Sequence, residues 1–330
     1  MKAITLAGYG GPEVLRLRHD VPIPQPGPED IQIKVAFAGI NFMDIHTRQG
    51  KYETSQTYPV RLPCTLGMEG AGEVTAVGAS VTRFKPGDRV AWCISWGCYA
   101  DYAVVPQSRA ARIPDGIAFD QAAASIFQGS TAHYLVHDVA RLGQGSTCLV
   151  HAASGCIGQI LVQLAKKAGA TVFVTASTPE KRAAAITLGA DYAMDYGNGA
   201  FADTVREKTK GQGVDVVFDA VGKTTLRDSF RATRKRGLVI NYGSVAGSLK
   251  DLDPIELGEA GSLFLTRPRL ADHLVDADMV QMRADAIFGA LLDGSLSIPV
   301  TDYYTLETVQ QAHDLLENRK QIGKAVLRIA

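Results

Sequence analysis

The segment STCLVHAASGCIGQILVQLAKKAG, residues 146–169, constrains the fold more than any other part of the chain. Its first seven residues form a largely apolar run typical of a buried strand, and apolar residues recur with helical spacing after Gly155. Between strand and helix, Ala152, Gly155 and Gly158 form a variant of the GxGxxG pattern. Such a turn lets the backbone approach a pyrophosphate, which then faces the helix N-terminus. The segment predicts a dinucleotide-binding loop, with a ligand-free strand–helix turn as the alternative. The loop residues expected to contact the dinucleotide are Ala152, Ser154, Gly155, Cys156, Ile157 and Gly158.

Strands and helices alternate throughout residues 126–270. A helix at 178–189 is expected to stop at Gly189. The basic run 231–237 is interpreted as the polar end of another helix, capped by Gly237. Six apolar runs in this region, alternating with helices, predict an α/β domain with a doubly wound parallel six-stranded sheet of the Rossmann type.

Residues 1–125 have a different texture, rich in Gly, Pro and short β-type runs separated by turn signals. The tail, residues 271–330, contains two helical patterns and a closing strand, and we expect it to rejoin the first domain. The sequence therefore predicts a β-barrel domain of residues 1–125 with 271–330, and a dinucleotide-binding domain of residues 126–270. The strands expected in the first domain lie at 31–40, 72–78, 88–94 and 99–105.

The charge balance limits the possible partners. Lys and Arg total 34, and Asp and Glu total 34, so the formal net charge is zero. This balance argues against nucleic acid or an anionic membrane as the main partner. We find no pattern of a signal peptide or a membrane span, so the expected location is cytoplasmic. The five cysteines have scattered spacings, which predict no disulfide framework.

The end of the second Rossmann strand indicates which dinucleotide would bind. An acidic residue at this place binds the ribose hydroxyls of NAD, whereas the segment TASTPEK, residues 175–181, offers hydroxyl groups and Lys181. Hydroxyls and an ammonium suit the dianionic 2′-phosphate of NADPH. We expect Ser177, Thr178 and Lys181 to bind this phosphate, and we interpret Glu180 as the capping-box partner of Ser177. A solvated Lys181 on a helix surface is the alternative.

Together, these features resemble the medium-chain dehydrogenase/reductase superfamily over essentially the whole chain. The motifs that carry the resemblance are GINFMDIHTRQG, LGMEGAGEVTAVG, KPGDRV, QAAASIFQGSTAHYL, HAASGCIGQILVQLAK and GSLFLTRP. Within the superfamily, the chain most resembles the zinc-free NADPH:quinone oxidoreductases of the zeta-crystallin-like branch. The resemblance implies a GroES-like β-barrel catalytic domain in addition to the Rossmann domain, with NADPH as the cofactor.

The first of these motifs contains Asp44 and His46, two residue types that bind metal. The zinc enzymes of the superfamily place Cys at the position of Asn41, His at Met68 and a second Cys near Phe127. An amide and a thioether are poor substitutes for the thiolate and imidazole that zinc prefers. The sequence therefore predicts no metal, and leaves Asp44 and His46 without a ligand set.

The resemblance also implies where the reactants bind. Asn41, His46 and Tyr52 are expected on the substrate side, with Asn41 also near the nicotinamide. Asn41 would donate a hydrogen bond to a carbonyl oxygen, and Tyr52 would stack and reach the far oxygen. His46 would donate a proton, line the cleft or lie at its rim. Other positions match family residues of the cofactor or cleft, but would equally suit a helix start or ordinary packing. They are Thr131, Tyr196, Tyr242, Phe264 and Arg319.

Cys156 departs from the small Gly that the family has at this place in the loop. A helix N-terminus favours the thiolate form of a cysteine, so a redox-sensitive thiol is one hypothesis. A small side chain tolerated in the turn is the other.

These residues predict an NADPH-dependent quinone reductase that works without a metal, because a quinone is already electrophilic and needs no Lewis acid. A zinc-free reductase of enones or enoyl thioesters needs the same cofactor geometry and is the first alternative. An NADPH-binding sensor, structural or RNA-binding protein with little turnover is an alternative of another class. The strand expected at 261–267 would be an apolar sheet edge, and we expect a homodimer that pairs this edge across a two-fold axis.

Overall fold

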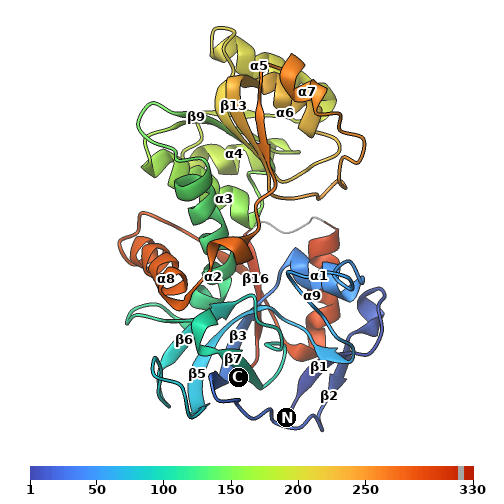
Figure 1. Ribbon diagram of the computed structural model, residues 1–330, viewed down its shortest axis with the longest axis vertical. Helices are drawn as coiled ribbons and strands as arrows, with labels where there is room; N and C mark the ends of the chain where they lie inside the picture. Colours follow the sequence, from blue (N-terminus) through green and yellow to red (C-terminus); the bar gives the residue numbers. More distant parts are fainter. Residues whose placement is uncertain (319–322) are drawn as a thin grey trace. The chain divides into compact units, whose positions relative to one another are not determined.

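The computed structural model describes residues 1–318 and 323–330 (Figure 1). The chain forms two compact units, each with its own core. The first unit contains Met1–Ser130 and His273–Ala330, and the second contains Thr131–Asp272. Arg319, one of the expected cofactor residues, lies outside the described residues.

The second unit is built on a parallel six-stranded sheet with the order β11-β10-β9-β12-β13-β14. Numbered along the chain within this unit, the order is 3-2-1-4-5-6, which is that of the doubly wound Rossmann fold. The predicted Rossmann sheet is therefore confirmed. Its strands are β9 (Thr147–Val150), β10 (Thr171–Thr175), β11 (Tyr192–Met194), β12 (Val214–Asp219), β13 (Thr233–Asn241) and β14 (Phe264–Thr266).

Helices connect these strands (Figure 1). The helix α3 (Cys156–Lys167) packs against β9 and β10 because the apolar residues at its helical spacing, such as Ile160 and Leu164, are buried. The helix α4 (Pro179–Thr187) packs against β10 and β11, and Gly189 follows it with a φ of 105°, so the predicted stop is confirmed. The other helices of this unit are α5 (Ala200–Lys208), α6 (Leu226–Ala232) and α7 (Ile255–Glu259).

The basic run 231–237 differs from its prediction. The helix α6 ends and β13 begins within this run, so Gly237 does not cap a helix. On β13, Thr233 and Leu238 are successive recorded partners of β12, and the basic residues between them bulge out of the ladder. Arg236 within the bulge has a φ of 58°. The prediction failed because bulged residues carry no alternating apolar pattern.

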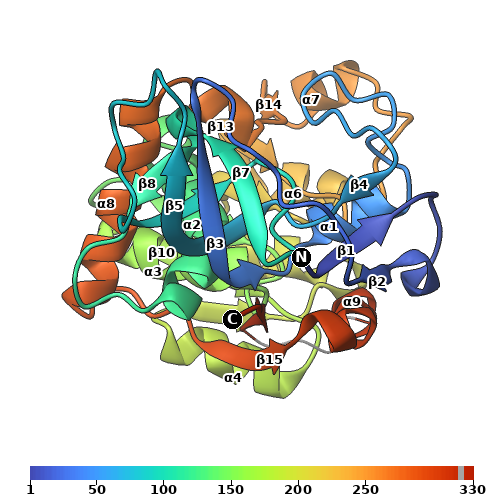
Figure 2. The same ribbon diagram turned by 90° about the horizontal axis from the view of Figure 1, so that it is seen from below.

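The first unit contains a seven-stranded sheet with the order β15-β16-β3-β5-β6-β8, in which β7 also pairs with β3. The long strand β3 has β5 along one side, and β7 and β16 along the other. Figure 2 shows β3 between β5 and β7. A smaller sheet has the order β2-β1-β4. The strands are β1 (Ala3–Leu6), β2 (Arg16–Arg18), β3 (Asp30–Gly39), β4 (Cys64–Thr65), β5 (Glu69–Val77), β6 (Arg89–Cys93), β7 (Tyr102–Pro106), β8 (Ala110–Arg112), β15 (Val300–Tyr304) and β16 (Lys324–Arg328).

The remaining α-helices are α1 (Phe42–Arg48), α2 (Phe119–Tyr134), α8 (Ala277–Leu292) and α9 (Val309–Glu317). The helix α2 continues into a π-helical turn, Leu135–Val139. Thr131 therefore lies in the last turn of α2, and the idea that it starts a helix is wrong. No helix within the described ranges has the length and apolar character needed to cross a membrane. All five cysteines are free thiols.

Candidate active site and cofactor loop

Asn41 forms the N-cap of α1 and is held from several directions within the first unit. Its side chain is almost completely buried, with 1% exposed. The amide oxygen Oδ1 accepts hydrogen bonds from Lys324 Nζ at 2.9 Å and from Gln128 Nε2 at 3.0 Å. The amide nitrogen Nδ2 donates to Glu69 Oε2 at 2.9 Å. An amide carries two N–H groups, and only one of them has a partner among the contacts of the described residues.

A buried ion pair stands behind Asn41. Lys324 Nζ lies 2.8 Å from Glu69 Oε2, and the two side chains are 1% and 0% exposed. Lys324 also donates to the Ile40 carbonyl at 3.1 Å, and Glu69 Oε1 accepts from the Phe127 backbone N–H at 2.7 Å. Gly39 leaves the space for this carboxylate, because a Cβ at that position would collide with Glu69 Oε2. No motif in the sequence pointed to this pair, because its members lie 255 residues apart.

The residues at the expected zinc positions do not fit a zinc ion. Asn41 presents an amide whose oxygen is bound to an ammonium, and Met68 is a buried thioether, whereas zinc prefers thiolate and imidazole. The charge of Lys324 would repel a second cation at this place. Over residues 1–318 and 323–330, no three His, Cys, Asp or Glu side chains are grouped so as to hold an ion.

Asp44 and His46, which raised the question of a metal site, have separate environments. Side chains two positions apart on a helix point in nearly opposite directions. Asp44 is completely buried, and its Oδ2 accepts from the Asn41 backbone N–H at 2.9 Å and from Tyr99 Oη at 3.1 Å. Burial raises the pKa of Asp44 to about 7. His46 is partly exposed, so the two residues do not form one site.

His46 belongs instead to a row of aromatic side chains. Its ring centroid lies 6.1 Å from that of Phe42 and 6.1 Å from that of Tyr52, and Tyr52 lies 5.7 Å from Tyr58. The structure thus brings together His46 and Tyr52, two of the expected substrate residues. Such a row offers ring surfaces against which a flat, conjugated molecule packs. Phe42 was missed, although its spacing of four residues from His46 on a helix is a usable signal.

A second cluster of buried, hydrogen-bonded polar side chains joins α1 to α9, and no sequence motif pointed to it. Tyr99 Oη, which contacts Asp44, lies 3.5 Å from His313 Nε2. His313 Nδ1 lies 3.4 Å from Arg48, which forms a 2.7 Å ion pair with Glu317. Burial, together with the neighbouring Arg48 charge, lowers the pKa of His313 to about 3. These contacts keep the inward face of α1 fixed while its other face carries the aromatic row.

We call the predicted dinucleotide-binding loop, residues 152–158, the phosphate loop. It forms the tight strand-to-helix turn that its pattern predicts. It leaves β9 and enters α3, whose N-cap is Gly155. Ala152 has a φ of 53°, which produces the sharp turn. Gly158 has to be glycine, because a Cβ there would collide with the Ala152 carbonyl oxygen. The N–H groups in the first turn of a helix have no partners within the helix, and they suit the two phosphates of a dinucleotide. Ser154, Cys156 and Ile157 lie in or directly beside this turn.

The segment expected to bind the 2′-phosphate lies between β10 and α4. Thr178, rather than Ser177, is the N-cap of α4, and its Oγ1 accepts from the Lys181 backbone N–H at 3.3 Å. The capping box assigned to Ser177 and Glu180 is therefore wrong. The pKa of Glu180 lies below its usual value because its own backbone N–H and the Thr178 hydroxyl hydrogen-bond to the carboxylate. Arg182, the residue after Lys181, donates to the Ala176 carbonyl at 3.0 Å and forms an ion pair with Asp195 at 3.4 Å, so its charge is already partnered.

Thr175 faces the interior instead of a phosphate, because its Oγ1 lies 2.7 Å from Nδ1 of the buried His151. His151 Nε2 lies 3.0 Å from Ser229 Oγ, which in turn donates to Asp219 at 2.8 Å. Burial lowers the pKa of His151. This neutral imidazole ties the start of the phosphate loop to β10 and α6.

The other expected cofactor residues are spread over the second unit. Thr131 is buried in α2. Tyr196 follows β11 and packs partly against the core. Tyr242 follows β13, and burial raises its pKa. Phe264 is 62% exposed and begins β14, the opposite edge of the sheet from β11. The loop residues are thus brought together, whereas Tyr196 and Phe264 stand at the two edges.

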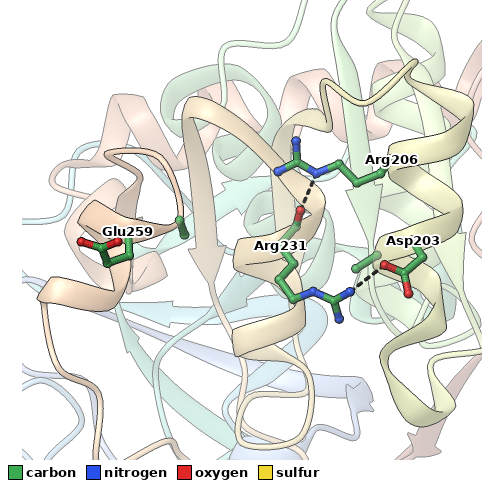
Figure 3. Close-up of a pocket in the computed structure, with 6 residues that line it drawn as sticks. Asp203, Arg206, Arg231 and Glu259 are labelled. Carbon is green, nitrogen blue, oxygen red and sulfur yellow. Dashed lines mark hydrogen bonds and ion pairs between the residues drawn. The ribbon is translucent and has the colours of Figure 1, made fainter.

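A hollow of 330 Å³ in the second unit is not an anion site despite its two arginines (Figure 3). Arg206 donates to the backbone carbonyls of Gly211, Gln212, Arg231 and Thr233. Arg231 forms ion pairs with Asp203 and Asp228. These guanidinium groups therefore serve the fold.

Comparison with known protein families matches both halves of the chain. Residues 27–115 match the alcohol dehydrogenase GroES-like domain, and residues 156–277 match the family described as zinc-binding dehydrogenase. The predicted combination of a GroES-like domain with a Rossmann domain is thereby confirmed.

Three relatives cover almost the whole chain. The quinone oxidoreductase of Pseudomonas aeruginosa is 38% identical over 99% of each chain. The crystal structure of Escherichia coli quinone oxidoreductase complexed with NADPH is 33% identical, covers 99% of this chain and 100% of its own, and has a TM-score of 0.94. The 2-haloacrylate reductase of a Burkholderia species is 34% identical over 96% of each chain.

Proposed function

The chain belongs to the quinone oxidoreductase family of the medium-chain dehydrogenases/reductases, and from this we propose that it transfers a hydride from NADPH to a quinone. The first unit would be the catalytic domain and the second the NADPH-binding domain. The observation that carries the proposal is the cluster of buried polar side chains around Asn41, which does not offer ligands that fit a metal ion. An acceptor reduced without a Lewis acid has to be electrophilic already, and a quinone meets this condition.

The residues of the chain would divide the work of binding and orientation. NADPH, when bound, supplies the hydride. The phosphate loop and the first turn of α3 hold the pyrophosphate, and Thr178 and Lys181 bind the 2′-phosphate. The remaining Asn41 N–H donates to the acceptor oxygen as negative charge develops on it. Tyr52 and His46 pack against the acceptor ring, and His46 gives a proton to the reduced product.

A second candidate is the reduction of an activated carbon–carbon double bond. The similarity to a 2-haloacrylate reductase favours it, because 2-haloacrylate is a conjugated alkene. The requirements for the chain are the same, since hydride again creates negative charge that a donor such as Asn41 stabilises.

Steady-state oxidation of NADPH with a panel of quinones and a panel of enones tests both candidates. We expect turnover with quinones, a preference for NADPH over NADH and no effect of a chelator. Faster turnover with enones would favour the second candidate. Tight NADPH binding without turnover on either panel would contradict both and favour a sensor.

The cofactor preference is expected to depend on Lys181. A charge-assisted hydrogen bond is worth about 1.5–3 kcal/mol, so Lys181→Ala should raise the KM for NADPH by about 10- to 100-fold. The KM for NADH should not change, because NADH has no 2′-phosphate. Lys208→Ala is the matched control, since Lys208 is exposed on α5 beside Glu207. An equal change for both coenzymes would contradict this role.

We further propose a homodimer formed through the edge strand within 261–267. Support comes from β14, which is an edge strand: it pairs with β13 on one side and with no other strand of the described residues on its other side. Phe264 on this strand is exposed. Sedimentation at micromolar concentration should give twice the mass of one chain, and a monomeric mass would contradict the assembly.

The five free thiols support a cytoplasmic location, because thiols persist in reducing compartments.

A further inference from the structure

We propose that Lys324 and Gln128 are positioning residues for the hydride acceptor, because together they determine which end of the Asn41 amide faces it. The inference rests on the function proposed above, in which an Asn41 N–H binds the acceptor oxygen. In the zinc enzymes of the superfamily a metal ion occupies this part of the fold. In this chain the buried cation is a lysine, and it acts through a neighbouring amide.

The head group of Lys324 is fixed in orientation. An ammonium has three N–H donors and no acceptor. Its three acceptors are the Ile40 carbonyl at 3.1 Å, Asn41 Oδ1 at 2.9 Å and Glu69 Oε2 at 2.8 Å. The side chain is 1% exposed, so these three contacts satisfy it in place of water.

This arrangement allows one orientation of the Asn41 amide. The two ends of an amide have nearly the same shape but opposite hydrogen-bonding character. Lys324 can only donate and the Glu69 carboxylate can only accept, so Oδ1 has to face Lys324 and Nδ2 has to face Glu69. Gln128 Nε2 donates to the same Oδ1 at 3.0 Å and reinforces this choice. The remaining Nδ2 proton therefore has a fixed direction.

The environment of Gln128 shows that this orientation is held at some cost. Its Oε1 is buried and has no hydrogen-bond partner among the described residues, and an unsatisfied buried acceptor is unfavourable. Turning this amide over would place its oxygen against Asn41 Oδ1, and two acceptors would then face each other. The bond from the Lys324 ammonium is charge-assisted and lies in a region of low dielectric, where it polarises the Asn41 amide.

The test is the dependence of rate on the electrophilicity of the quinone. The logarithm of kcat/KM is plotted against the reduction potential for a series of substituted quinones, for the wild type and for Lys324→Met. Loss of the fixed donor should lower kcat by about 10- to 100-fold, less than the roughly 10²–10³ lost with an oxyanion donor itself. The plot for Lys324→Met should be steeper than that for the wild type. Quinones of low reduction potential are poor acceptors, and their reduction depends most on the enzyme's stabilisation of the developing negative charge. The KM for NADPH should not change.

Arg283→Met is the matched control, because it removes another fully buried cation of the same unit. It should lower stability and leave the slope of the plot as in the wild type. Gln128→Met removes the second orienting donor without removing a charge, and it replaces Lys324→Met if that variant does not fold. A folded variant of either residue with the wild-type slope would overturn the inference. A wild type without quinone turnover would instead contradict the proposed function.

Discussion

Replacing Glu69 with glutamine is expected to lower the free energy of unfolding by about 3–5 kcal/mol, because the substitution leaves Lys324 as a buried charge without its counter-charge. The two side chains are 0% and 1% exposed, so water cannot take the place of the lost carboxylate. The loss should appear as a lower midpoint in urea unfolding with an unchanged m-value.

The double variant Glu69→Gln with Lys324→Met removes both charges and is expected to be more stable than Glu69→Gln alone, since buried ion pairs can be replaced by neutral groups at little cost. Asp20→Asn is the matched control, because it breaks the exposed pair with Arg18 and should leave the midpoint unchanged. A double variant that loses the sum of the two single losses would contradict the assigned pairing.

Asp44→Asn and His313→Gln are expected to change the pH dependence of stability in opposite directions. The pKa of Asp44 rises from 3.8 to about 7 on folding, so its contribution is present below pH 3.8 and is lost as the pH rises towards 7. The pKa of His313 falls from 6.5 to about 3, so its contribution is present above pH 6.5 and is lost as the pH falls towards 3. Between about pH 4 and 6.5 the two contributions oppose each other.

Relative to the wild type, Asp44→Asn should gain about 1.4 kcal/mol of stability for each pH unit across this window, and His313→Gln should lose about the same amount. Urea unfolding at several pH values between these limits measures both slopes. The pH dependence of stability of the double variant Asp44→Asn with His313→Gln should be the same as that of the wild type. This result would separate the effect of titration from general damage to the fold. Parallel curves for all four proteins would show that neither buried group titrates as assigned.

The Rossmann half of the fold was largely predictable because its signals are local. The apolar spacing of α3, the turn from Ala152 to Gly158 and the stop at Gly189 all act within a few residues of the elements that they define. The bulge in β13 was not predictable, because its shape depends on the partner strand β12 and not on the basic residues themselves.

The candidate site was predictable only in part for a related reason. Asn41, His46 and Tyr52 were selected from one short motif, and the structure brings His46 and Tyr52 together. Lys324 and Glu69, which hold Asn41, are 255 residues apart in the chain, and His313 and Arg48 are 265 residues apart. No periodicity or spacing links such pairs, because burial in the folded unit creates their interaction.

The position of Lys324 also sets an order of events during synthesis. The strand β16 stands between β15 and β3 in the first unit, yet it follows the entire second unit in the chain. The second unit is continuous and can fold as soon as it leaves the ribosome. The nascent first unit lacks the ammonium opposite Glu69 until residue 324 has emerged, so the Asn41 amide acquires its orientation last.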